Sequence, residues 1–173
     1  MKFLTVFSDA SFHESGAAGY AFYVRDDTTI IKEGFPVPWI ANSSTEIEMF
    51  AMCHAILHAL DYLPHEPGDV VVAQTDCEHV IRGFDLNCKT SEYEANMRDS
   101  VLSALRRSDI RLRWKHVKAH TGAKDVRSYV NQFCDTHAKI HMRQRRKVLD
   151  QKFISYVNEL ARKKDSKIPA CQP

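Results

Sequence analysis

Two apolar segments of this chain each lead into an aspartate. Residues 3–7 are followed by Ser8 and Asp9, and residues 70–73 lead through two further residues to Asp76. Short apolar runs rich in β-branched and aromatic residues predict buried strands. A carboxylate beside a buried strand is costly unless it is paired or binds a cation. These segments therefore predict a sheet that presents acidic groups at the ends of two strands.

The remaining segments predict the order of the elements. Residues 19–24 and 28–37 read as two further strands, joined by turns short enough for an antiparallel meander. Helical spacing predicts helices over 45–60, from Ser91 and from about residue 132, and alternation over 110–117 predicts a half-buried strand with a basic outer face. Three strands, helix, strand, helix, strand, helix is the order of an α/β layered fold.

Length and composition indicate one domain with an appended segment. The chain has 173 residues, of which 44% are hydrophobic and 27% charged. We place a catalytic domain at 1–145 and a basic helical extension with a disordered end at 146–173, which we expect to pack back onto the domain. No apolar run approaches the roughly 20 residues that span a bilayer. The expectation is a cytoplasmic monomer without a membrane segment, whose C-terminal helix could mediate a contact.

The net charge of +2 hides a strong asymmetry along the chain. Residues 1–105 contain 6 Lys and Arg against 16 Asp and Glu, whereas residues 106–173 contain 18 against 6. An acidic site beside a basic surface suits a substrate with a phosphate backbone. Ordinary solvated basic faces would give the same count, so the asymmetry alone leaves both interpretations open.

Cysteines and histidines give no pattern of a metal-thiolate or zinc site. The five cysteines are an odd number and none is in Cys-x-x-Cys spacing, which argues against a disulfide framework and a zinc-thiolate site. The pairs His54/His58 and His137/His141 are spaced i, i+4 on expected helices, but neither has a third ligand nearby. We interpret both pairs as structural or surface residues.

Four acidic residues are the candidates for a metal site: Asp9, Glu48, Asp76 and Asp135. Carboxylate oxygens suit Mg²⁺ or Mn²⁺, and two such ions roughly 3.5–4 Å apart serve phosphodiester hydrolysis. Two alternatives stay open. Glu46 competes with Glu48, because either could complete a capping box with a residue three positions earlier. Asp135, expected just before a helix, could instead serve the helix dipole.

Five segments resemble, in order, the motifs of the type 1 ribonuclease H family: Phe7–Ser11, Ser44–Ala51, Gln74–Glu78, His116–His120 and Asn131–Ala138. Each motif alone is weak, but the ordered set is specific and covers roughly residues 1–145. The resemblance implies a five-stranded mixed sheet, with an antiparallel meander of three strands plus two parallel strands, flanked by helices. It implies an endonuclease that cleaves the RNA strand of RNA–DNA hybrids.

The resemblance also implies roles for individual residues. The four carboxylates would hold two Mg²⁺ or Mn²⁺ ions. His120 would be a further catalytic residue on a loop, where its near-neutral pKa suits proton transfer or product release. The substrate would be contacted by Ser11, Ser44, Thr45, Lys118 and Asn131.

Several positions depart from the family's pattern. Ala10 replaces the usual glycine, Ser44 and Thr45 replace paired asparagines, and Glu78 stands where many members have glutamine. The basic handle of many bacterial members is absent. These changes keep the acidic set but leave strict hybrid specificity open. The alternatives are another nuclease on the same fold and a non-catalytic module that binds RNA or hybrids.

Overall fold

A computed structural model describes residues 1–117 and 126–165, with side chains at 1–117 and 128–159. Lys118 and His120 lie outside the described residues. The strands are β1 (Phe3–Phe12), β2 (Ala18–Arg25), β3 (Ile30–Pro36), β4 (Val70–Thr75) and β5 (Arg111–His116). The helices are α1 (Ser44–Tyr62), α2 (Glu78–Gly83), α3 (Glu92–Arg107) and α4 (Val126–Asp165). The short α2 was not predicted from the sequence.

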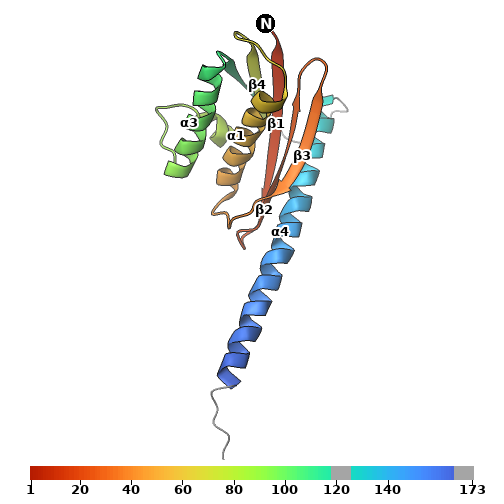
Figure 1. The fold of residues 1–173 in the computed structure, drawn as a ribbon, viewed down its shortest axis with the longest axis vertical. Helices are drawn as coiled ribbons and strands as arrows, with labels where there is room; N and C mark the ends of the chain where they lie inside the picture. Colours follow the sequence, from red (N-terminus) through yellow and green to blue (C-terminus); the bar gives the residue numbers. More distant parts are fainter. Residues whose placement is uncertain (118–125, 166–173) are drawn as a thin grey trace, which may run out of the picture.

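The strands form one mixed sheet in the order β3-β2-β1-β4-β5 (Figure 1). β1 pairs antiparallel with β2, and β2 with β3, whereas β1 with β4 and β4 with β5 are parallel. The predicted five-stranded mixed sheet flanked by helices is confirmed. Because β1 is central and parallel to β4, the C-terminal ends of these two strands lie side by side at one edge of the sheet.

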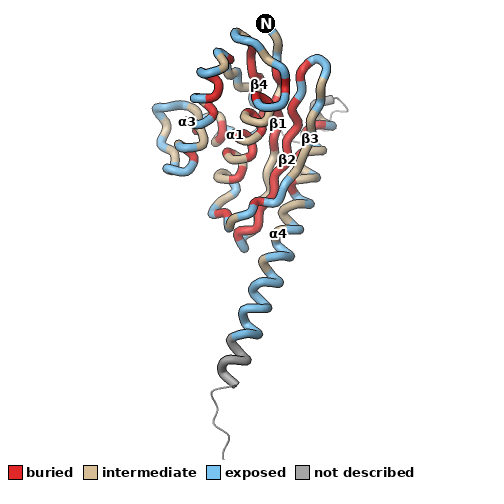
Figure 2. Tube along the Cα trace, viewed as in Figure 1, coloured by how far each residue is buried: buried red, intermediate tan, exposed pale blue. Residues whose placement is uncertain are grey.

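One face of the sheet packs against α1, with α3 outside it (Figure 1). Leu4 and Val6 of β1 and Met52 and Ile56 of α1 are fully buried in the main core. Figure 2 shows the buried stretches of the strands and of α1 in red. Full burial of such a side chain contributes about 1.5–3 kcal/mol. The predicted capping box at Ser91 starts α3: the Ser91 hydroxyl accepts from the Glu94 backbone N–H, and the Glu94 carboxylate accepts from the Ser91 backbone N–H. This layer fixes α1 rigidly beneath β1.

The other face of the sheet packs against α4. Phe7, Ala21 and Tyr23 bury their side chains against Val130 and Cys134 of the helix. Two glycines let the helix come close: a Cβ at Gly19 would meet the α4 backbone, and one at Gly34 would lie 2.8 Å from the His141 ring. The α4 backbone therefore rests almost directly on β2.

α4 is longer than the sequence predicted and projects away from the domain (Figures 1 and 2). It begins at Val126 rather than near residue 132 and runs without interruption past residue 145. Residues 150–159 are all exposed, so the expectation that this segment packs back is wrong for them. No glycine or proline occurs between Val126 and Asp165 to break the helix. None of the described helices is both long and apolar enough to cross a membrane.

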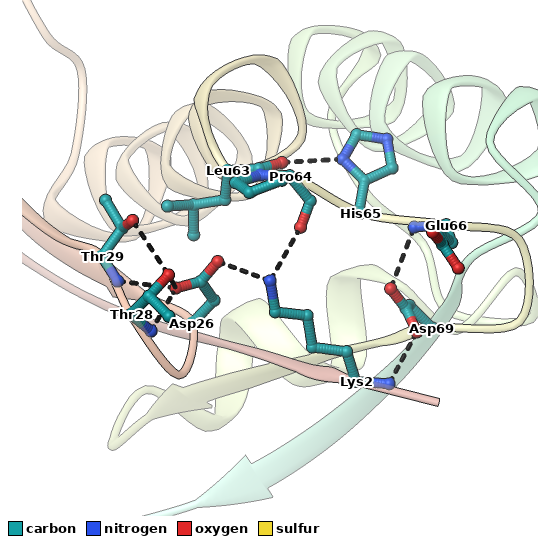
Figure 3. A network of polar contacts seen from close by, with 9 residues as sticks. All are labelled: Lys2, Asp26, Thr28, Thr29, Leu63, Pro64, His65, Glu66 and Asp69. Atoms are coloured by element: carbon teal, nitrogen blue, oxygen red, sulfur yellow. Dashed lines mark hydrogen bonds and ion pairs between the residues drawn. The ribbon is translucent and has the colours of Figure 1, made fainter.

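A polar network ties the start of β1 to two connections (Figure 3). The Lys2 ammonium donates to Asp26 at 2.7 Å, and the Thr29 backbone N–H donates to the same carboxylate at 2.7 Å. The Lys2 backbone N–H donates to Asp69 at 2.6 Å, which also accepts from the Glu66 N–H at 2.9 Å. The β2–β3 turn and the α1–β4 connection are thereby held against the N-terminal end of β1.

Candidate active site

Two of the acidic candidates come from adjacent parallel strands. Asp76 directly follows β4, as predicted. Asp9 lies inside β1, opposite Ala21, rather than at the end of the strand. The strand is longer than predicted because its pairing with β2 continues to Phe12. Since Phe7 pairs with Gln74, continuing the parallel register by two residues brings Asp9 beside Asp76.

The structure brings Glu48, not Glu46, to these aspartates. Ser43 is the N-cap of α1 and accepts from the Glu46 backbone N–H at 3.2 Å. The Glu46 carboxylate accepts hydrogen bonds from Trp39 Nε1 at 3.3 Å and Asn42 Nδ2 at 2.9 Å, so it belongs to the cap region. Glu48 interacts with the charges of Asp9 and Asp76. Helix phase thus places Glu48, and not Glu46, with the two aspartates.

Asp135 reaches the same cluster from α4. It lies well inside the helix, which corrects the expectation that it precedes one, and its distance from Val126 excludes a helix-dipole role because that effect fades within the first turn. Lys139, one turn later, forms an ion pair with Asp135 at 2.6 Å. Lys139 was not predicted as a site residue, although its i+4 spacing from Asp135 was a usable signal.

The cluster holds more negative charge than its surroundings neutralise. Burial, and next the charge of Asp76, raises the pKa of Asp9 to about 7, with Asp135 adding to the effect and Lys139 opposing it. Burial, and next the charges of Asp9 and Asp76, raises the pKa of Glu48 well above its usual range. Carboxylates that repel one another in this way favour either a bound proton or a bound cation.

The donor chemistry fits a hard divalent cation. The four side chains offer only carboxylate oxygens, which Mg²⁺ and Mn²⁺ prefer. Across residues 1–117 and 126–165, no group of three or more His, Cys, Asp or Glu side chains is arranged so that it could hold a metal ion. The protein alone thus presents a set of repelling carboxylates with the right ligand type.

The other predicted site residues in the described part of the chain lie on β1, α1 and α4. Ser11 lies two residues after Asp9 in β1, opposite Gly19. Asn131 lies one turn before Asp135 on α4 and therefore on the same helix face. Ser44 and Thr45 form the first turn of α1, where the Thr45 hydroxyl lies 3.1 Å from that of the N-cap Ser43.

The RNase H family model matches residues 1–143 of the chain. The chain belongs to the RNase H family. The match spans all of the strands and the part of α4 that packs on the sheet, so the family's fold accounts for the arrangement described above. Comparison with functionally curated proteins gave no match.

Solved structures of RNase H domains share this fold. RNase H1 from the archaeon Halobacterium salinarum superposes with a TM-score of 0.63 at 16% identity, covering 82% of this chain and 98% of that one. The N-terminal RNase H domain of a Mycobacterium tuberculosis protein gives 0.65 at 14%, covering 86% and 99%. The compost-derived LC11-RNase H1, solved in complex with an RNA/DNA hybrid, gives 0.56 at 12%, covering 79% and 96%. At these identities the likeness establishes the fold.

Proposed function

We propose that this RNase H family member is an endonuclease that hydrolyses the RNA strand of RNA–DNA hybrids with the help of divalent metal ions. The observation that carries the proposal is that four carboxylates from separate parts of the chain act on one another through their charges: Asp9, Glu48, Asp76 and Asp135. They come from β1, from α1, from the residue after β4 and from α4. The hybrid-bound LC11-RNase H1, which has the same fold, supports the choice of substrate.

Asp9, Glu48, Asp76 and Asp135 would hold two Mg²⁺ or Mn²⁺ ions. Bound there, the ions would lower the pKa of a water and stabilise the leaving oxygen of the phosphodiester. The raised pKa values of Asp9 and Glu48 support this assignment, because such carboxylates gain from a neighbouring positive charge. Lys139 partly balances the charge of Asp135 beside the site.

Five side chains would position the substrate: Ser11, Ser44, Thr45, Lys118 and Asn131. Asn131 is on the Asp135 face of α4, where its amide can orient the substrate or a water. The wide, shallow minor groove of an A-like duplex exposes 2′-hydroxyls, which short hydroxyl and amide side chains can reach. His120 would transfer a proton at the leaving group or assist product release. The catalytic unit would comprise residues 1–145.

Cleavage of a labelled RNA–DNA hybrid in Mg²⁺ or Mn²⁺ tests the proposal, with single-stranded RNA, duplex RNA and duplex DNA in parallel. We expect cleavage of the hybrid's RNA strand alone, lost with EDTA and in Asp9→Asn but retained in Asp27→Asn, which removes an equal charge at an exposed turn. Cleavage of another nucleic acid would move the function to a different nuclease class. Hybrid binding without cleavage would make the chain a non-catalytic module.

A further inference from the structure

β5 carries three cations on one face: Arg111, Arg113 and Lys115. They alternate with Leu112 and Trp114, which pack against the main core, with the Trp114 ring 4.9 Å from that of Phe84. Because successive side chains of a strand point to opposite faces, the three cations point away from α1 and α3. All three residues are exposed. We refer to them as the β5 row.

The β5 row lies on the face of the sheet that also carries Asp9. Lys115 pairs with Gln74, and Gln74 pairs with Phe7, whose side chain packs in the cluster beneath α4. Asp9 follows two residues later in β1 and so points to the same face. From strand spacings, the Cα of Lys115 lies about 12 Å from that of Asp9, and the Cα of Arg111 about 22 Å. The row therefore leads away from the carboxylates along β5.

The described helices leave this part of the face uncovered. α4 packs on β1, β2 and β3, toward the opposite edge of the sheet from β5 (Figure 1). A hollow of about 340 Å³ lies beside the row and is lined by Met1, Phe3, Val70, Arg111, Leu112 and Arg113. Among the described residues no carboxylate forms an ion pair with any cation of the row. Arg111 donates to the uncharged Met1 Sδ at 3.3 Å, so the positive charges of the row are left to meet an external anion.

We propose that the β5 row binds the phosphate backbone of the nucleic-acid substrate on the flank of the active site. The inference rests on the proposed function and adds a binding surface to it. Successive cations are about 6.6 Å apart along the strand, which is close to two nucleotide steps of about 3.4 Å along a duplex axis. Arginine suits this role, since its guanidinium donates two parallel hydrogen bonds to a phosphate. Reaching Arg111 from the carboxylates requires roughly six base pairs.

A matched pair of triple variants tests the row. R111Q/R113Q/K115Q removes it, and R143Q/K147Q/K152Q removes three exposed cations of α4 with the same loss of charge. Binding of a fluorescent RNA–DNA hybrid is measured by anisotropy across a salt series, in an Asp9→Asn background so that no substrate is consumed. Thermal unfolding verifies that both variants fold.

We expect the row variant to lose at least about tenfold in affinity at low salt and to lower the slope of log K against log[salt] by about 2–3, because each phosphate contact contributes roughly 0.9. The α4 variant should stay within about twofold. With Asp9 intact, the row variant should raise KM and leave kcat unchanged. On hybrids with only about three base pairs flanking the cleavage site, the row variant and the wild type should bind with the same affinity. R111K/R113K keeps the charge but not the paired hydrogen bonds of the guanidinium, so it should keep the wild-type salt slope and lose less affinity than the row variant.

Equal losses in the two triple variants, or an unchanged salt slope in the row variant, would overturn the row as a specific surface. A fall in kcat at unchanged KM would also overturn it, since that result would place the residues in the chemical step. Failure of the proposed function looks different. If the wild type cleaves another nucleic acid instead of the hybrid, the same variants are compared on that substrate. A selective loss of affinity in the row variant would then support the row, and equal losses in both triple variants would overturn it. Absence of any nucleic-acid binding by the wild type would overturn both.

Discussion

Gly19 of β2 lies so close to α4 that a Cβ on it would come within 2.6 Å of the carbonyl oxygen of Ala138. Ala138 is three residues after Asp135 and is itself fully buried. The absence of a side chain at Gly19 therefore sets how deeply α4 sits on the sheet, and with it the position of Asp135 relative to Asp9. The packing of α4 and the geometry of the carboxylate cluster depend on the same contact.

Gly19→Ala is expected to lower stability by about 1–3 kcal/mol, because the added methyl meets backbone atoms that cannot rotate away. The rate of hybrid cleavage should also fall, because α4 must move outward from the sheet and Asp135 moves with it. Urea unfolding and the rate of hybrid cleavage measure the two effects. Gly83→Ala is the control: its Cβ would meet the flexible end of Met49 at 3.3 Å, and the smaller effect there should leave cleavage intact. Similar losses in both variants would contradict this account.

Asp9→Asn should abolish cleavage yet stabilise the metal-free protein at high pH. The pKa of Asp9 is about 7 in the folded protein, above its ordinary value near 4. The folded state therefore holds this proton more tightly, and stability is lost as pH rises from about 4 through 7. In EDTA at pH 8 the free energy of unfolding of the variant should exceed that of the wild type by up to about 4 kcal/mol. The difference is smaller if Glu48, rather than Asp9, holds the proton. Near pH 4 the two proteins should be equally stable.

Added Mg²⁺ should raise the melting temperature of the wild type and raise that of Asp9→Asn much less, because the cation offsets repulsion that the variant has already reduced. Thermal scans with and without Mg²⁺ at pH 8 measure both shifts. Equal Mg²⁺ shifts in the two proteins would argue that the ion binds elsewhere.

Glu78→Gln should strengthen hybrid binding. Glu78 opens α2, its side chain is 70% exposed, and its contact with Arg82 is a long 3.9 Å. A carboxylate two residues after Asp76 repels substrate phosphates, and amide replacement removes that repulsion. We expect KM to fall about twofold to fivefold at low salt, with the gain shrinking as salt is added. Glu92→Gln, at an exposed position in the first turn of α3, should leave KM unchanged. A rise in KM would contradict this repulsion and would indicate that the Glu78 carboxylate helps to bind the substrate.

Asp26→Asn should cost about 1–2 kcal/mol at pH 7. Its side chain is buried, and the hydrogen bond from Lys2, followed by those from the turn, holds the pKa of Asp26 below its usual range. A lowered pKa means that its contribution is present above about pH 4 and is lost as pH falls further. The difference between variant and wild type in urea unfolding should thus shrink toward pH 2. The neighbouring Asp27→Asn, at an exposed position, is the control and should leave the free energy of unfolding at pH 7 within about 0.5 kcal/mol of the wild type.

A chain that ends at Leu149 should keep the melting temperature and hybrid cleavage of the full protein. Residues 150–159 bury nothing on the domain, so their removal costs no core contacts. Circular dichroism melting and cleavage rates provide the comparison. A large drop in either would reveal a role for the projecting helix that its exposure in the isolated chain does not indicate.

The sequence predicted most elements because their signals are local. Apolar runs predicted the strands, and a Ser–Glu pair predicted the α3 cap. Boundaries were less accurate. β1 extends past Asp9 because pairing with β2 continues to Phe12, and α4 starts earlier and ends later because no residue in it breaks a helix. The choice between Glu46 and Glu48 also needed the structure, since both satisfy the same capping pattern.

By itself, the sequence determined the fold class and the order of the longer elements, and it named the four candidate carboxylates, because hydrophobic periodicity and motif order are properties of neighbouring residues. Tertiary structure decided how those carboxylates meet. Only the parallel pairing of β1 with β4 places Asp9 beside Asp76. Only the close packing of α4 against Gly19 brings Asp135 to these two aspartates. It also decided that the β5 row shares their face, because strand register across three strands links residues far apart in the chain.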